Sequence, residues 1–175
     1  MKKLFAVLLV AIPFTAFADR FDNVYKLNNT IDYEFDNEKP WVEIEAHLPP
    51  YPKAENLLPF YVSAATDNNF FVDAASISVG TDDVVRYTLV VKSAAGAENV
   101  SYEGIRCGTR DFKLYAFGRS DGTWAKARTA KWQDIRYKDR NRQQHVLYDD
   151  FFCPNKIMVT SPEAAVKALK NGPKL

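Results

Sequence analysis

Hydrophobic and polar residues alternate through the middle of the chain with the period of two that is typical of β-strands. In the run Val84–Lys92, the side chains of Val85, Tyr87, Leu89 and Val91 fall on one side. Comparable runs cover residues 60–64, 70–79, the stretch that ends at Cys107, 111–117 and 123–132. Because no helical stretch between these runs is long enough for a parallel crossover, the pattern predicts an antiparallel β-meander of five to six strands.

Helical signals follow the predicted sheet. Asp139 can cap a helix through RNRQQHVLYDDFF, which Pro154 prevents from continuing. Ser161, followed by proline, begins a second helix that ends before Gly172. The predicted fold class is therefore α+β, with C-terminal helices packed on an antiparallel sheet.

The residues ahead of the predicted sheet are irregular and acidic. Residues 19–56 form an extended N-terminal arm in this interpretation, with one short strand over 41–46 and a polyproline-like stretch at Leu48–Pro52. The predicted division is an arm over 19–56, a sheet over 57–135 and a helical part over 136–175, all within one domain of 19–175.

The first 18 residues have the three-part pattern of a secretory signal peptide. Lys2 and Lys3 precede the apolar run Leu4–Ile12, and small residues stand at Ala16 and Ala18. We predict cleavage between Ala18 and Asp19 and localisation to the periplasm. No cysteine near this position could carry a lipid, so a lipoprotein is not expected. No later apolar run is long enough for a membrane helix.

Cys107 and Cys153 are the only cysteines in the chain. In the oxidising space that receives exported proteins, two cysteines most often pair, so we predict a disulfide between them. A metal site would need more ligands than two histidines, His47 and His145, supply at a familiar spacing to a cysteine. No metal and no cofactor are expected.

Charge is divided unevenly along the chain, although the formal total is only +1. Residues 19–99 hold 14 acidic and 6 basic residues, a balance of −8, and residues 100–175 hold 8 acidic and 15 basic residues, a balance of +7. Such asymmetry can indicate an anionic partner, or it can reflect the two halves neutralising each other within one domain. The second interpretation is preferred because little net charge remains.

Hairpin registers bring part of the positive charge onto one candidate surface. With two-residue loops at Gly108–Thr109 and Asp121–Gly122, Arg106 lies opposite Asp111, Tyr102 opposite Tyr115, Tyr115 opposite Arg128 and Phe117 opposite Lys126. The surface predicted to bind a ligand consists of Arg106, Tyr115, Trp124, Lys126, Arg128 and Trp132. It could stack on rings and bind carboxylates or phosphates of an anionic glycan such as peptidoglycan. Two alternatives remain: the acidic arm covers this surface, or it is ordinary solvated sheet.

No catalytic motif is found, so an enzyme is not expected. His145 and Asp149, four residues apart on a predicted helix, could form a base and its orienting carboxylate, which keeps a hydrolase without a recognisable motif as an alternative. The favoured function is a non-catalytic binding or interaction module whose partner is an envelope protein or an anionic glycan. Nucleic acid is not expected as a partner.

Several motifs resemble the cryptic neisserial protein family of small exported proteins. They include VVRY at Val84–Tyr87, GAENV at Gly96–Val100 and YEGIRC at Tyr102–Cys107, with LYDDFFCP and KPWVEIEAHLPPYP farther away. The resemblance implies an envelope protein with a family-wide pair of cysteines. It implies no catalytic residue, because that family has no established activity.

Overall fold

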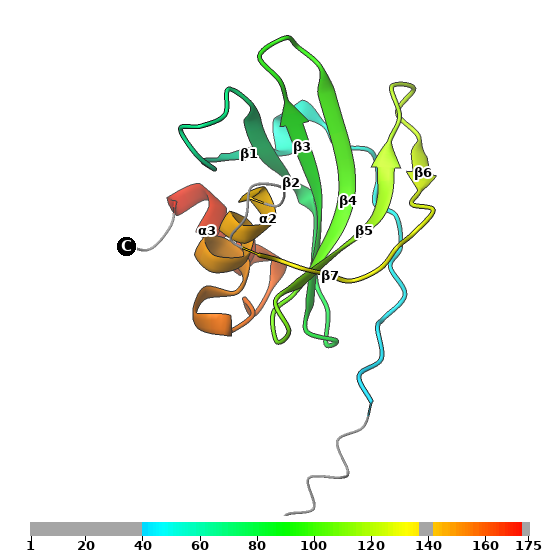
Figure 1. Cartoon of the computed structure of the whole chain (residues 1–175), viewed down its shortest axis with the longest axis vertical. Helices are drawn as coiled ribbons and strands as arrows, with labels where there is room; N and C mark the ends of the chain where they lie inside the picture. The colour runs from blue at the N-terminus through cyan, green and yellow to red at the C-terminus, as the bar shows by residue number, and fades with distance from the viewer. Residues whose placement is uncertain (1–39, 137–141, 173–175) are drawn as a thin grey trace, which may run out of the picture. The chain divides into compact units, whose positions relative to one another are not determined.

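The computed structural model describes residues 40–136 and 142–172, and within them a single antiparallel sheet dominates (Figure 1). Neighbours along the sheet follow the order β1-β2-β3-β4-β5-β6, and β7 also pairs with β5. The strands are β1 (Leu57–Phe60), β2 (Asn69–Val79), β3 (Val84–Lys92), β4 (Glu98–Arg106), β5 (Asp111–Gly118), β6 (Trp124–Lys126) and β7 (Gln133–Asp134). The predicted meander and the α+β class are confirmed.

Several strand predictions differ from the structure at the edges of the sheet. The first strand, expected over 60–64, is β1, which begins three residues earlier. The last, expected over 123–132, forms only the short β6, and β7 follows just beyond that range. Residues 41–46 are extended but form no strand. The backbone N–H and C=O groups of Ile44 bond to the side chains of Asp82 and Arg86 instead of to a neighbouring strand.

One extra residue in β5 changes the predicted registers. Arg106 does lie opposite Asp111, but the pairing shifts by one between Tyr102 and Glu103, so Tyr102 faces Ala116 instead of Tyr115. Such a bulge reverses the alternation beyond it. Phe117 lies opposite Ser101 of β4 and is half exposed at 51%. Its partner in β6 is Ala125, not Lys126, because the loop between β5 and β6 is one residue longer than predicted.

The two hairpin loops next to β5 also differ from the predicted pairing. Arg110, not Gly108, takes the positive φ at the first loop, and the Arg110 amide donates to the Arg106 carbonyl. Beyond the second loop, Lys126 pairs with Ala116, one position away from the predicted register. Arg128 lies beyond the end of β6 and therefore does not face Tyr115 in the sheet.

The C-terminal part of the chain is helical, as predicted. Its helices are α2 (Arg142–Val146), the π-helix η3 (Leu147–Phe152) and α3 (Pro162–Asn171). A 3-10 turn, η4 (Pro154–Lys156), follows Cys153. Another 3-10 turn, η2 (Ala54–Asn56), precedes β1 near the start of the described residues. The Ala164 amide donates to the side-chain oxygen of Ser161, the predicted cap of α3. The predicted cap of the first helix, Asp139, lies outside the described residues, as do the predicted signal peptide and its cleavage site.

The helices bury one face of the sheet. Tyr87 of β3 is fully buried, and its ring packs on Phe152 of η3 with centroids 5.2 Å apart. The predicted disulfide joins Cys107, just after β4, to Cys153, just after η3. It closes a 46-residue separation and lies in the same apolar core, where chain-entropy reasoning assigns it about 4 kcal/mol. No helix in the described part of the chain is both long and apolar enough to span a membrane.

Candidate functional site

The opposite face of the sheet is covered by residues from the N-terminal arm. Figure 1 shows the C-terminal helices grouped on one side of the sheet, while the arm, in cyan, runs along the other. We call Trp41–Pro52 the docked segment. The basic aromatic face beneath it consists of Arg86, Arg106, Lys113, Tyr115, Trp124 and Trp132.

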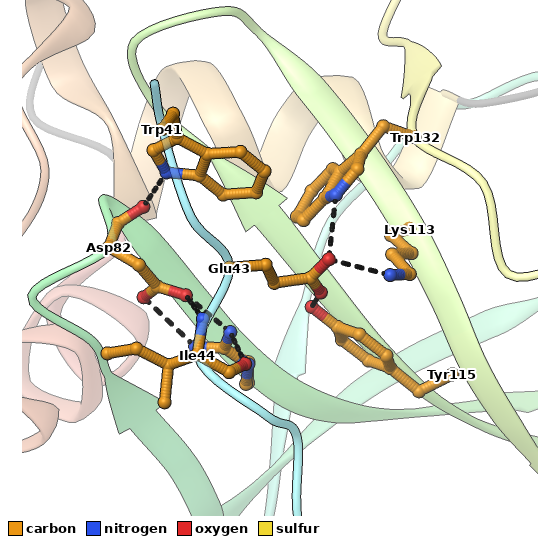
Figure 2. A network of polar contacts seen from close by, with 8 residues as sticks. Trp41, Glu43, Ile44, Asp82, Lys113, Tyr115 and Trp132 are labelled. Atoms are coloured by element: carbon orange, nitrogen blue, oxygen red, sulfur yellow. Dashed lines mark hydrogen bonds and ion pairs between the residues drawn. The ribbon is translucent and has the colours of Figure 1, made fainter. Parts of the chain in front are cut away.

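Three donors from the basic aromatic face converge on the carboxylate of Glu43 (Figure 2). Lys113 Nζ lies 2.7 Å from Oε2, the Tyr115 hydroxyl donates to Oε1 at 2.9 Å, and Trp132 Nε1 donates to Oε2 at 3.2 Å. Both oxygens are therefore bound, one of them by a cation. An ammonium, a phenol and an indole N–H aimed at one point form a carboxylate-binding site.

The pKa of Glu43 reports how strongly this site favours the charged form. Burial by itself raises the pKa, but the hydrogen bonds from Lys113, Tyr115 and Trp132 outweigh it, so the pKa lies below its ordinary value. The effect on Tyr115 is the reverse, because burial and its hydrogen bond to Glu43 raise the pKa of the phenol. Tyr115 is therefore a donor, and Glu43 an ionised acceptor, at neutral pH.

Trp41 anchors the docked segment two residues before Glu43. The Arg106 guanidinium lies 3.8 Å from the centroid of its ring, and Trp132 meets it edge-on at 5.7 Å. The Trp41 indole N–H donates to the Asp82 carbonyl at 2.7 Å. Both the ring and its polar edge are thereby recognised.

A buried ion pair holds the backbone of the docked segment. Asp82, in the turn before β3, and Arg86, near the start of β3, form this pair, with Arg86 Nη2 2.6 Å from Asp82 Oδ2. The Ile44 amide donates to Asp82 at 2.8 Å, and Arg86 donates to the Ile44 carbonyl at 2.7 Å. The Ile44 side chain itself is 46% exposed, so this contact recognises the backbone alone.

The docked segment makes a second contact near its end. Trp124 donates to the Pro49 carbonyl at 2.9 Å and packs on Tyr51 with ring centroids 5.6 Å apart. The Tyr51 hydroxyl donates to the Arg119 carbonyl at 3.0 Å. A side chain at Gly118 would come within 2.9 Å of the Tyr51 ring, so glycine leaves room for it.

Glycine has the same role under the carboxylate site. Gly104 of β4 lies opposite both Arg86 and Lys113. A Cβ atom there would lie 2.8 Å from the Tyr115 hydroxyl oxygen and 3.0 Å from Val84, two neighbours packed into the sheet. Glycine inside a strand usually marks such a close approach, and here it lets the phenol reach Glu43.

Five of the six predicted ligand-binding residues border the docked segment. Arg106, Tyr115, Trp124 and Trp132 contact it directly, whereas Lys126 is exposed and lines a groove of about 310 Å³ beside it. The groove is bordered by Glu43, Ile44, Glu45, Ala46, Leu48, Lys113, Tyr115, Lys126 and Ala130. Arg128 is exposed beyond the end of β6, and the structure records no bond from it to the docked segment. The predicted surface is thus largely occupied by the chain itself.

Sequence reasoning missed the residues that hold the arm's backbone and carboxylate. No motif or spacing in the sequence singles out Glu43 or Asp82. One signal was present: Arg86 interrupts the apolar run at the start of β3, and a cation buried there requires an acidic partner. Nothing in the sequence indicated which carboxylate would lie beside Lys113.

The His145 and Asp149 pair considered for a hydrolase does meet in space. His145 Nδ1 lies 3.0 Å from Asp149, but Arg110 binds both oxygens of that carboxylate at 2.7 Å. The negative charge that would orient and stabilise an imidazolium is therefore already compensated by a guanidinium. This cluster connects the loop after β4 to the C-terminal helices.

Among residues 40–136 and 142–172, no cluster of three or more His, Cys, Asp or Glu side chains could hold a metal ion.

No curated protein and no solved structure shows a significant match to the chain. The family model of the CNP1-like family matches residues 36–170, which include the docked segment, the whole sheet and both cysteines. The chain therefore belongs to the CNP1-like family.

Proposed function

We propose that this protein is an exported, non-catalytic interaction module of the cell envelope, and that its binding surface is the basic aromatic face. In this proposal it is cleaved after Ala18, resides in the periplasm without a lipid anchor, and shares the lineage of the cryptic neisserial proteins. The signal-like N-terminus and the disulfide support the location.

The observation that carries the proposal is the convergence of Lys113, Tyr115 and Trp132 on a single carboxylate. A sheet surface needs no such arrangement in order to be covered, since apolar side chains would suffice. The donors are instead placed as in a recognition site, with Glu43 in the position of a ligand. The proposed ligand is therefore an acidic, carboxylate-bearing partner that takes the place of the docked segment.

The test uses the mature chain with Trp41→Ala and Glu43→Gln, which removes the two main anchors of the docked segment. Val42→Ala with Glu45→Gln is the control, because it removes the same single negative charge and truncates one apolar side chain at two exposed residues of the same segment. Immobilised poly-L-glutamate should retain the first variant and release it at high salt, since exposed charges are screened.

Wild type and the control should pass through the column, and adding Lys113→Ala to the first variant should abolish retention. Equal behaviour of the first variant and the control would contradict the proposal.

A second candidate function is peptidoglycan binding with the docked segment in place. It is favoured by the exposure of Lys126 beside the groove and of Arg128 close by in the sequence. Isolated peptidoglycan should then bind wild type, and Lys126→Ala with Arg128→Ala should abolish that binding. If wild type does not bind peptidoglycan, this candidate fails without affecting the first.

A further inference from the structure

We infer that the basic aromatic face is a peptide-binding site, and that residues 41–44 are its built-in occupant. The partner is an extended protein segment with an aromatic residue two positions before an acidic one. This inference rests on the proposed function and specifies the class of ligand.

The aromatic position is recognised on both its apolar and its polar side. Arg106 and Trp132 bind the Trp41 ring, and the Asp82 carbonyl accepts its indole N–H. Arg106 Nε is buried without a hydrogen-bond partner among the described atoms, and no ion pair to this guanidinium is recorded among the described residues, although Asp111 lies opposite it in the sheet. Its main recorded contact is the Trp41 ring, so an aromatic residue is the group that this position selects.

The acidic position follows two residues later, on the same side of an extended chain. Glu43 fills it with its side chain mostly buried and with three donors around it. A neutral amide there would lose the charge interaction with Lys113 and would direct its own N–H group towards a donor. The site therefore discriminates for a carboxylate.

The side chains at the intervening and following positions are not selected. Val42 is 76% exposed, and Ile44 is held through its N–H and C=O groups by Asp82 and Arg86. An acceptor and a donor placed on successive polar groups of one residue are suited to an extended peptide of any sequence. Together, the contacts define an aromatic–any–acidic–any pattern.

The occupant is attached through contacts that another peptide could reproduce. The docked segment contains no helix or strand, and its recorded contacts with the sheet are made by side chains of one partner or the other. A tethered segment nevertheless has an effective concentration on the order of millimolar, so a free peptide with the same contacts competes poorly. A partner that also reaches the exposed Lys126 gains a contact that the arm is not seen to make.

The experiment measures binding of a fluorescent peptide with the sequence of residues 40–52, PWVEIEAHLPPYP, to the mature chain. The Trp41→Ala, Glu43→Gln variant should bind it at least about tenfold more tightly than wild type, because the tethered competitor is weakened. Replacing the peptide's tryptophan by alanine, or its first glutamate by glutamine, should each weaken binding about tenfold, which corresponds to about 1.4 kcal/mol. Replacing the intervening valine by alanine should have no effect.

Lys113→Ala in the same variant should remove the advantage of the glutamate peptide over the glutamine peptide, which assigns the acidic position to this site. If the double variant does not fold, Glu43→Gln alone should give the same ranking of peptides with a smaller difference from wild type. Near-ultraviolet circular dichroism and the absence of free thiols establish folding.

Equal binding of all peptides would overturn the inference. So would an absence of peptide binding while poly-L-glutamate is still retained, which leaves the proposed function standing. Loss of both would overturn both. A wild-type dimer that Trp41→Ala abolishes would assign the site to the arm of a second copy and overturn the partner peptide.

Discussion

On one side of the sheet, the C-terminal helices bury an apolar core around Tyr87 and Phe152, and a disulfide crosses from the sheet to the helices. On the other side, the docked segment is held by charged and aromatic groups such as Lys113 and Arg106, with backbone groups bound to side chains. Because the contact between the helices and the sheet is apolar packing over a wide area, it forms together with the folded core. The attachment of the docked segment consists of a few discrete polar contacts, which water or another peptide can replace.

The same difference appears in two carboxylates on opposite faces. Glu43 is paired with Lys113, and this pairing keeps its pKa below the ordinary value despite burial. Glu103 faces the helices, where Ser101, Tyr87 and Gln144 donate to it and no cation is recorded beside it. Burial therefore raises the pKa of Glu103. The arm side favours a negative charge, whereas the helix side opposes one.

The largest effect is expected on the helix side. Replacing Cys107 and Cys153 by serine should lower the free energy of unfolding by about 2–5 kcal/mol, because the unfolded chain without the disulfide has a higher conformational entropy. Urea denaturation of the mature protein measures this, and reduction of wild type should reproduce it. A loss under about 1 kcal/mol would show that the bridge adds little constraint.

A smaller effect is expected on the arm side. Trp41→Ala removes a stacking contact and a hydrogen bond, so the free energy of unfolding should fall by about 1–2 kcal/mol. Val42→Ala, at an outward-facing neighbour, should stay within about 0.5 kcal/mol of wild type. If Trp41→Ala costs as much as loss of the disulfide, the docked segment belongs to the cooperative core and the contrast between the faces is wrong.

The smallest effects, and the most diagnostic, are opposite dependences on pH. The lowered pKa of Glu43 means that its contribution is fully present above its ordinary value of 4.5 and is lost as the pH falls through the folded-state value. The raised pKa of Glu103 means that its contribution is most favourable below 4.5 and is lost as the pH rises through the folded-state value.

Urea denaturation across acidic and neutral pH measures both effects. The stability advantage of wild type over Glu43→Gln should shrink on acidification. The stability of Glu103→Gln relative to wild type should rise as the pH rises. Parallel profiles for the two variants would refute the distinction between the two carboxylates.

The sheet could be predicted from the sequence because each strand is encoded by the alternation of apolar and polar residues within its own short segment. The alternation in Val84–Lys92 gives β3 with the predicted bounds, and the serine cap and following proline give the start of α3. The bulge at β5 could not be predicted, since an extra residue in a strand leaves the apolar pattern nearly intact. That one residue moved Tyr102 from Tyr115 to Ala116, and a loop between β5 and β6 one residue longer than predicted changed the partners of Phe117 and Lys126.

The candidate site was only half predictable for a related reason. Clustered basic and aromatic residues around Cys107 indicated a surface, and four of them do meet the docked segment. Which acid pairs with which base depends on contacts between residues 70 positions apart, as for Glu43 and Lys113, and no sequence period encodes such a distance. The backbone contacts to Ile44 leave no side-chain signal at all.

Amide hydrogen exchange tests most directly whether the docked segment is a separable occupant. The Ile44 amide, bonded to Asp82, and the Leu89 amide, within β3, are compared over low urea concentrations. If the segment opens by itself, Ile44 exchanges with a lower opening free energy that hardly depends on urea, while exchange at Leu89 follows global unfolding. Equal opening free energies and equal urea dependence at the two amides would contradict the account.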